Sequence, residues 1–455
     1  MRFCSREFPL DTLPDLLKLP GYRMLDFHEE SGAYHIRVET MALPNHCPGC
    51  RSQDFTGFGK RTQVVRDIAS HGKWVGLYVH TRRFRCKTCR RTFYEALPAV
   101  HPKRRITARL IAWLEPLTLR QTFAHLAEET GLSRMTIRGV FDDYAARLEK
   151  ARTIDTPVWL GIDEVYLLRR SRGVLTNLDT GYVLDMLPDR NKPTVIRFLQ
   201  SLPNPERIRG VAMDMWPPYQ QAVRTVLPNA AIVVDKFHVL RLADFALDRV
   251  RKDIGQTLPQ NQRRALLHDA KAMRQRESTL ISTQTLRLSL WFENYPLLKK
   301  VYGARQAFYA MYDAPNRRDA EQRWHDWERG MDPELVPAFG RFRKTVRDWA
   351  PFIFAYFDQR ITNAATESAN NLIRIANRLG RGYSFPVIRA KIVFEPHAAQ
   401  VKRIVFKTRS KQDWARTADL MDRFSTNPGE DGFEIRSQGV DTAGLQRLIE
   451  MGEWS

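Results

Sequence analysis

The sequence predicts a multidomain α+β protein: a small zinc-bound β module, a helix-turn-helix unit, and an α/β core interrupted by an all-α insertion. Three observations predict this order. The chain has 455 residues, which is too long for a single ordinary core. Four of its five cysteines form two Cys-x-x-Cys pairs. The hydrophobic pattern then changes from helical spacing to short β-rich runs and back to helices.

The charge balance favours a polyanionic partner. Lys and Arg number 72 against 51 Asp and Glu, a net charge of +21. A merely basic soluble protein is the main alternative, with an anionic membrane surface well behind. The N-terminus has no continuous apolar run typical of a secretory signal, and no run approaches the roughly 20 apolar residues that cross a bilayer. We therefore expect a cytoplasmic protein without membrane contact.

Residues 40–100 are expected to form a β module around a structural Zn²⁺ ion. The ligands would be Cys47, Cys50, Cys86 and Cys89. Two-residue spacing lets both thiolates of a pair reach one ion, and two pairs complete a tetrahedral four-sulfur shell. A β-hairpin across 62–84 would bring the pairs together. Unrelated buried or redox cysteines are the alternative, which the doubled motif and flanking arginines disfavour.

Residues 101–150 begin with a basic hinge and continue with helical periodicity. Residues 123–142 have the layout of a helix-turn-helix, in which Gly131 allows the turn and Ser133 caps the second helix. An ordinary helical hairpin shares this spacing, but the cationic surroundings favour double-stranded DNA as partner. The expected DNA-binding residues are Ser133, Arg134, Met135 and Arg138 of the second helix and Lys103 and Arg104 of the hinge.

Residues 155–240 contain five β-rich runs, at 158–168, 173–178, 182–187, 209–213 and 231–234. Residues 179–181 (Asp-Thr-Gly) suit a hairpin turn between the second and third runs. A Pro-Pro pair at 217–218 suits the start of a helix between the fourth and fifth. Three meandering strands followed by strand, helix and strand is the order of a ribonuclease H-like α/β sheet.

Two aspartates lie in these apolar strands. Asp163 is in the middle of the first run, and Asp214 ends the fourth. A buried aspartate is costly unless it is paired or metal-bound. Each alone fits a structural role, but two on central strands favour a shared cation. Glu164 should point to the opposite face of the sheet, because side chains alternate along a strand.

Residues 241–360 are helical, basic and aromatic-rich, and they are expected to form an all-α insertion. The core resumes over 361–405 with a helix at about 363–379. Helical spacing aligns Glu367, Asn371, Arg374 and Arg378 on one polar face. By spacing alone this is most simply a solvated face. The segments 1–39 and 406–455 are expected to be an N-terminal segment and a C-terminal tail without a usable motif.

In this order, the motifs resemble those of the ISL-three type of insertion-sequence transposases over about residues 40–405. The shared features are the cysteine pairs, the helix-turn-helix, residues 161–164, 213–215 with Tyr219, 234–239, 361–363 with Glu367 and Asn371, and 381–385. The resemblance implies catalytic carboxylates at Asp163, Asp214 and Glu367. It also implies a supporting role for Asp235 and His238, to which we add Asn371.

The expected cofactor of this carboxylate set is Mg²⁺, with Mn²⁺ as substitute, because oxygen ligands suit both ions. Arg374 and Arg378 would contact phosphates nearby, or serve only solubility. The expected function is binding of terminal inverted repeats, DNA cleavage and strand transfer into target DNA, by a homo-oligomer on paired ends. The alternatives are a non-catalytic DNA-binding regulator derived from a transposase, and a nuclease that cuts without joining.

Overall fold

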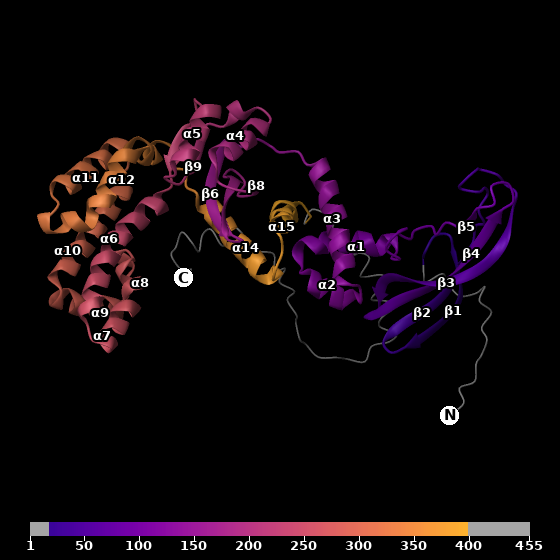
Figure 1. Cartoon of the computed structure of the whole chain (residues 1–455). Helices are drawn as coiled ribbons and strands as arrows, with labels where there is room; N and C mark the ends of the chain where they lie inside the picture. Colours follow the sequence, from indigo (N-terminus) through magenta and orange to yellow (C-terminus); the bar gives the residue numbers. More distant parts are fainter. Residues whose placement is uncertain (1–17, 399–455) are drawn as a thin grey trace, which may run out of the picture. The chain divides into compact units, whose positions relative to one another are not determined.

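The computed structural model describes residues 18–398, which divide into two units (Figure 1). The first contains residues up to Arg152 together with the end of the last helix, and the second runs from Thr153 to Val393. Cys4 and the tail at 406–455 lie outside the described residues. Within the described range, every helix is too short or too polar to span a membrane.

The first unit begins with a five-stranded sheet. Its strands are β1 (Tyr22–Glu30), β2 (Ala33–Thr40), β3 (Phe55–Ser70), β4 (Lys73–Cys86) and β5 (Thr92–Tyr94). The expected hairpin is β3–β4, and β5 pairs with β4 on the same sheet. β2 lies parallel to β4, and Ile36 and Val38 pack with Val75 and Leu77 in one core. β1 and β2 therefore belong to the same sheet as β3, β4 and β5.

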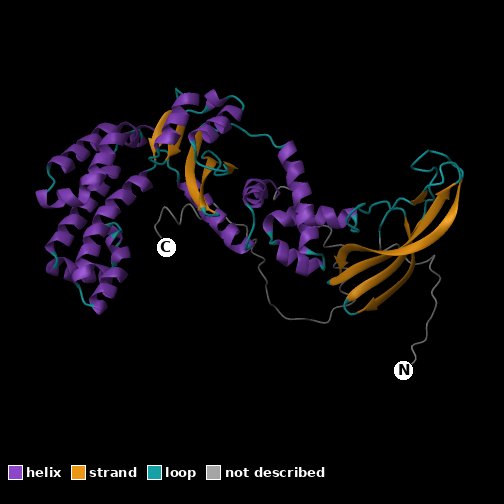
Figure 2. Ribbon diagram, viewed as in Figure 1, coloured by secondary structure: helices purple, strands orange, loops and turns teal. Residues whose placement is uncertain are grey.

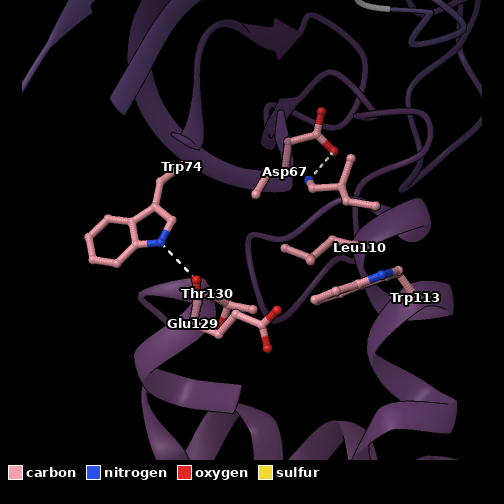
Figure 3. A pocket seen from close by; sticks show the side chains of 8 residues that line it. Asp67, Trp74, Leu110, Trp113, Glu129 and Thr130 are labelled. Carbon is pink, nitrogen blue, oxygen red and sulfur yellow. Dashed lines mark hydrogen bonds between the residues drawn. The ribbon is translucent and has the colours of Figure 1, made fainter. Parts of the chain in front are cut away.

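Three helices follow, which are α1 (Ala108–Arg120), α2 (Phe123–Thr130) and α3 (Arg134–Ala151). Of these, α1 and α2 contact this sheet. Asp67 on β3 accepts hydrogen bonds from Thr107 Oγ1 at 2.6 Å and Arg109 Nε at 2.8 Å. Trp74 Nε1 on β4 donates to the carbonyl oxygen of Glu129 at 2.8 Å, beside a cavity of about 160 Å³ (Figure 3). These contacts fasten the helices to the sheet.

The second unit is built on another five-stranded sheet. Its strands are β6 (Trp159–Leu167), β7 (Arg170–Asn177), β8 (Val183–Met186), β9 (Gly210–Met213) and β10 (Ala231–Val234). The order is β10-β9-β6-β7-β8, with β6, β7 and β8 antiparallel and β6, β9 and β10 parallel. Helices α4 (Lys192–Ser201) and α5 (Pro217–Val226) share the core of this sheet. The strands agree closely with the five expected runs; α4 had not been anticipated.

Residues 241–360 form only helices and loops (Figure 2). The α-helices of this region are α6 (Lys236–Thr257), α7 (Gln260–His268), α8 (Ala270–Met273), α9 (Ser282–Asn294), α10 (Pro296–Tyr309), α11 (Arg317–Arg329), α12 (Val336–Phe354) and α13 (Tyr356–Gln359). Many of the aromatic residues of this region lie in its core, where Phe308, Trp324 and Phe342 contact one another.

Two further helices return to the sheet after the insertion. α14 (Ala364–Gly380) packs against β6 and β7, and α15 (Phe385–Ala398) follows it. Ile373 of α14 and Ile388 of α15 share a core with Val165 of β6 and Val174 of β7. α14 and the beginning of α15 therefore pack on the sheet of the second unit.

Candidate active site, metal sites and DNA-binding elements

The four paired cysteines come together at one point of the first unit. Cys47 Sγ lies 3.7 Å from Cys89 Sγ, Cys50 Sγ lies 3.5 Å from Cys86 Sγ, and all four atoms lie within 4.8 Å of one another. A tetrahedral zinc site with Zn–S bonds of about 2.3 Å has S···S edges of about 3.8 Å. The backbone N–H of Cys89 donates to Cys86 Sγ and lowers the pKa of that thiol to about 6. The cluster thus fits a Zn²⁺ ion.

The helix-turn-helix has the expected local geometry. Gly131 ends α2 with a φ of +67°, a backbone conformation that favours glycine, and Ser133 Oγ accepts from the backbone N–H of Thr136 at 3.1 Å. Ser133, Arg134 and Met135 are exposed at the start of α3. The fourth expected DNA-binding residue of this helix, Arg138, is half-exposed and pairs with Asp142 at 2.8 Å.

The two basic hinge residues differ in their surroundings. Lys103 is exposed. Arg104 donates to the carbonyl oxygen of Gly139 at 2.8 Å and pairs with Asp143 at 2.6 Å, with only 20% of its side chain exposed. Arg104 therefore fastens the hinge to α3, a structural contact that the run of basic residues did not reveal.

The sheet of the second unit brings two of the three expected catalytic carboxylates together. β6 and β9 are parallel neighbours in which Ile162 is paired with Met213. Asp163 and Asp214 each follow one of these paired residues, so they lie next to each other at the same end of the two strands. His238 at the start of α6 joins them: its Nε2 lies 3.9 Å from Asp163 Oδ1 and 3.7 Å from Asp214 Oδ2. One oxygen or nitrogen atom from each residue lies within 4.8 Å of the others. This arrangement is suited to hold a cation.

His238 is oriented from behind by Asp235. Asp235 Oδ2 lies 3.3 Å from His238 Nδ1, and Asp235 Oδ1 accepts the backbone N–H of Asn363 at 3.2 Å. Burial opposes the charged imidazole, but Asp235, Asp214 and Asp163 together raise the pKa of His238 to about 9. Burial also raises the pKa of Asp163 to about 6. The carboxylates of Asp163, Asp214 and Asp235 are therefore gathered around His238 at a largely buried site.

Helix α14 is fastened tightly to β6. Asn363 Nδ2 donates to the carbonyl oxygen of Ile162 at 3.1 Å, and Asn370 Nδ2 donates to Asp163 Oδ2 at 2.9 Å. A Cβ atom on Gly161 would lie 2.5 Å from Asn363 Oδ1, and closer still to Thr366 Oγ1. The glycine is required here by the close approach of the helix.

Glu367 lies on the first turn of α14, between these two asparagines. Its side chain is 47% exposed, and its carboxylate lies 3.7 Å from the guanidinium of Arg241. It is not part of the group formed by Asp163, Asp214 and His238. Arg241 follows His238 by one turn of α6, so Glu367 faces the helix that carries the histidine.

The polar face expected on α14 is present but differs in one contact. Arg374 and Arg378 are exposed, and Arg374 Nη1 donates to Asn371 Oδ1 at 2.8 Å. Asn371, expected to support the site, is itself exposed, and the side chain that contacts Asp163 is that of Asn370. Asn370 is seven residues beyond Asn363 and therefore on the same side of the helix, which is the signal that could have identified it.

Comparison with known proteins assigns the chain to a family. Residues 160–392, just over half of the chain, match the family model described as "Transposase" of the ISL3 type, a DDE domain. The chain belongs to the ISL3 transposase family. Residues 43–89 also match the zinc-finger of transposase IS204/IS1001/IS1096/IS1165, and residues 95–145 match the helix-turn-helix domain of transposase family ISL3.

Curated transposases are among the relatives of this ISL3 transposase. The chain is 27% identical over 380 residues to the transposase for insertion sequence element IS1001 from Bordetella parapertussis, covering 80% of this chain and 91% of that one. It is 23% identical over 256 residues to the transposase for IS1557 from Mycobacterium tuberculosis, covering 50% and 57%. It is an insertion-sequence transposase with a helix-turn-helix DNA-binding domain and a DDE catalytic domain.

Proposed function

We propose that this transposase cuts and joins DNA at a site formed by Asp163, Asp214 and Glu367. The observation that carries the proposal is the meeting of Asp163 and Asp214 at neighbouring positions of two parallel strands. Glu367 comes from α14, whose flanking residues Asn363 and Asn370 contact β6 at Ile162 and at Asp163 itself. This supports Glu367 as the third carboxylate of the set.

The donor set fits Mg²⁺, or Mn²⁺ in its place. Both ions prefer carboxylate oxygens, such as those of Asp163 and Asp214. The Oδ1 atom of Asn370, beside Asp163, is buried without a hydrogen-bond partner among the described residues. When bound, two divalent ions in such a site activate the attacking oxygen of a phosphodiester reaction and stabilise the leaving oxygen.

The protein's own contribution is to hold these carboxylates in place. Asp163 and Asp214 would be ligands fixed by the sheet, and Asn370 orients Asp163 through its hydrogen bond. Asp235 orients His238 and also binds the backbone of Asn363 at the start of α14. The Asp235–His238 pair would thereby link the sheet, the insertion and the helix of Glu367.

The strand order supports a ribonuclease H-like catalytic core. Three antiparallel strands, β8-β7-β6, continue into the parallel strands β9 and β10. We propose that residues 155–240 and 361–405 form this core and that 241–360 are inserted into it.

The DNA-binding part of the proposal rests on α3 and α14. Ser133, Arg134, Met135 and Arg138 would read the terminal inverted repeats in the major groove, in the manner of a recognition helix. The exposed Arg374 and Arg378 extend along α14 from Glu367, where they would contact the phosphates of the reacting DNA. The protein would act as a homo-oligomer on two paired ends.

A labelled duplex carrying the element's end, incubated with a target plasmid and Mg²⁺, tests the proposed function. We expect the label to appear first in a cleaved strand and then joined to the plasmid. Binding without cleavage would instead favour the non-catalytic regulator, and cleavage without joining would favour a nuclease.

A further inference from the structure

The β module of the first unit carries an exposed face that neither the cysteine cluster nor the helix-turn-helix uses. Along β4, Phe84 and Cys86 point to one side, where Phe84 packs with Phe55 and Phe93 at ring-centroid distances of 5.4 and 5.7 Å. Because side chains alternate, Arg83 and Arg85 point to the other side. One side of the strand thus builds the module, and the other presents arginines.

A β-bulge on β3 adds an aromatic ring to this second side. Gly57 pairs with Phe84 and Lys60 pairs with Arg82, so β3 has one more residue than β4 between these pairs. Gly59 in the bulge has a φ of +109°, which favours glycine. The bulge leaves Phe58 47% exposed and next to the guanidinium groups of Arg83 and Arg85, at 5.2 and 5.5 Å from its ring centre.

Aromatic rings hold the arginines of this side in place. Arg61 lies over the ring of Tyr94 at 3.8 Å, and Arg83 donates to Thr92 Oγ1 at 2.9 Å. None of Arg61, Arg83 and Arg85 forms an ion pair with a carboxylate in residues 18–398. The acids nearby are engaged elsewhere.

The two carboxylates closest in sequence to this side already have partners. Glu95 is buried and paired with Arg82 at 2.7 Å, and Asp54 is paired with Lys87 at 2.7 Å. The positive charge of the three arginines is therefore not neutralised by the described part of the protein.

We propose that this arginine–aromatic face, formed by Phe58, Arg61, Arg83, Arg85 and Tyr94, binds the phosphate backbone of duplex DNA. A guanidinium forms paired hydrogen bonds to phosphate, and stacking on a ring fixes its plane beforehand. Bases of a single strand would need open ring faces for stacking. Tyr94 is covered by Arg61, and Phe58 is approached by two guanidiniums, so phosphate contacts fit this face better.

The arginine–aromatic face and the recognition helix belong to the same unit. The sheet and the helices are joined by the bonds of Asp67 to Thr107 and Arg109 and by the bond of Trp74 to Glu129. The backbone N–H of Arg66 also donates to the carbonyl oxygen of Arg105 at 2.9 Å. The face would therefore add sequence-independent affinity for DNA to the unit that already carries the recognition helix. This proposal does not depend on which residues are catalytic.

The test measures binding of the full-length, zinc-loaded chain to a fluorescent duplex of random sequence between about 50 and 200 mM salt. The variant carries Arg61→Gln, Arg83→Gln and Arg85→Gln. Each lost phosphate contact lowers the slope of log K against log salt by about 0.9, so three should lower it by about 2.7. The zinc content of the variant reports whether the module remains folded.

The matched control removes the same charge from exposed arginines of the insertion, through Arg264→Gln, Arg318→Gln and Arg341→Gln. A second variant, Phe58→Leu with Tyr94→Leu, keeps every charge but removes the rings, and should weaken binding roughly fivefold. The proposal is overturned if the face variant loses no more of the salt slope than the control. It is also overturned if only binding of a single-stranded oligonucleotide falls.

Discussion

Substitution of Gly161 by alanine tests the contact between β6 and α14 that positions Glu367. The added methyl group would meet Asn363 Oδ1 at 2.5 Å and Leu178 Cδ2 at 2.9 Å. Overpacking of this kind costs about 1–3 kcal/mol. If Asn363 moves away, its hydrogen bond to Ile162 is lost, and an unsatisfied buried polar group adds about 1–3 kcal/mol.

The expected result is a loosened α14 in a protein that still folds. A local loss of about 2 kcal/mol corresponds to a roughly 30-fold larger equilibrium constant for local opening of the helix. Hydrogen exchange of the amides in residues 364–380 measures this change. Cleavage of a labelled element end should fall, because Glu367 and Asn370 both lie on this helix. Recognition of the terminal repeat should persist, since the helix-turn-helix is in the other unit, and only the part of the affinity that Arg374 and Arg378 of α14 contribute should fall.

The matched control is Gly303→Ala on α10. Apart from its chain neighbours and the backbone of its own helix, no atom lies within 4 Å of a Cβ placed there, so alanine should be neutral or stabilise the helix by up to about 1 kcal/mol. If Gly161→Ala behaves like Gly303→Ala in both exchange and cleavage, the contact between α14 and β6 does not position the site.

Three further predictions concern the remaining sites. Cys86→Ser should remove about one Zn²⁺ per chain and unfold the module around it, and metal analysis showing unchanged zinc would contradict the four-sulfur site. Arg138→Ala should weaken binding to the terminal repeat by about 1–3 kcal/mol and relax the preference for one base pair. If the variant selects the same sequences as the native protein from a pool of random duplexes, another residue reads the bases. Asn370→Ala should lower the cleavage rate about 10- to 100-fold without affecting DNA binding, because Asp163 loses its orienting hydrogen bond; an unaltered rate would reduce Asn370 to a packing role.

Local patterns in the sequence predicted much of this structure. The five runs of the second sheet stand out because they are apolar, β-branched and separated by turn residues. The cysteine pairs are recognisable because both thiolates of a pair lie within three residues of each other. Gly131 and Ser133 mark the turn of the helix-turn-helix by backbone conformation and capping, which are also local properties.

Contacts between distant segments could not be read in the same way. From the sequence, residues 1–39 are expected to hold no usable motif, because nothing local indicates that the strand with Ile36 and Val38 pairs in parallel with β4. The spacing on α14 indicates a polar face, but only packing on β6 turns Asn370 rather than Asn371 toward Asp163. The ion pair of Glu367 with Arg241 likewise depends on where the insertion leaves and re-enters the core.

The most direct test of the proposed catalytic set is Glu367→Gln, assayed for repeat binding, end cleavage and strand transfer on one labelled duplex. The isosteric amide should leave folding and binding intact and abolish both reactions, as Asp163→Asn and Asp214→Asn should, because one site serves both steps. Glu164→Gln is the control. Glu164 pairs with Arg190 at a partly exposed position, so losing this ion pair should have only a mild effect on cleavage and joining. Full cleavage and joining by the Glu367→Gln protein would contradict the account.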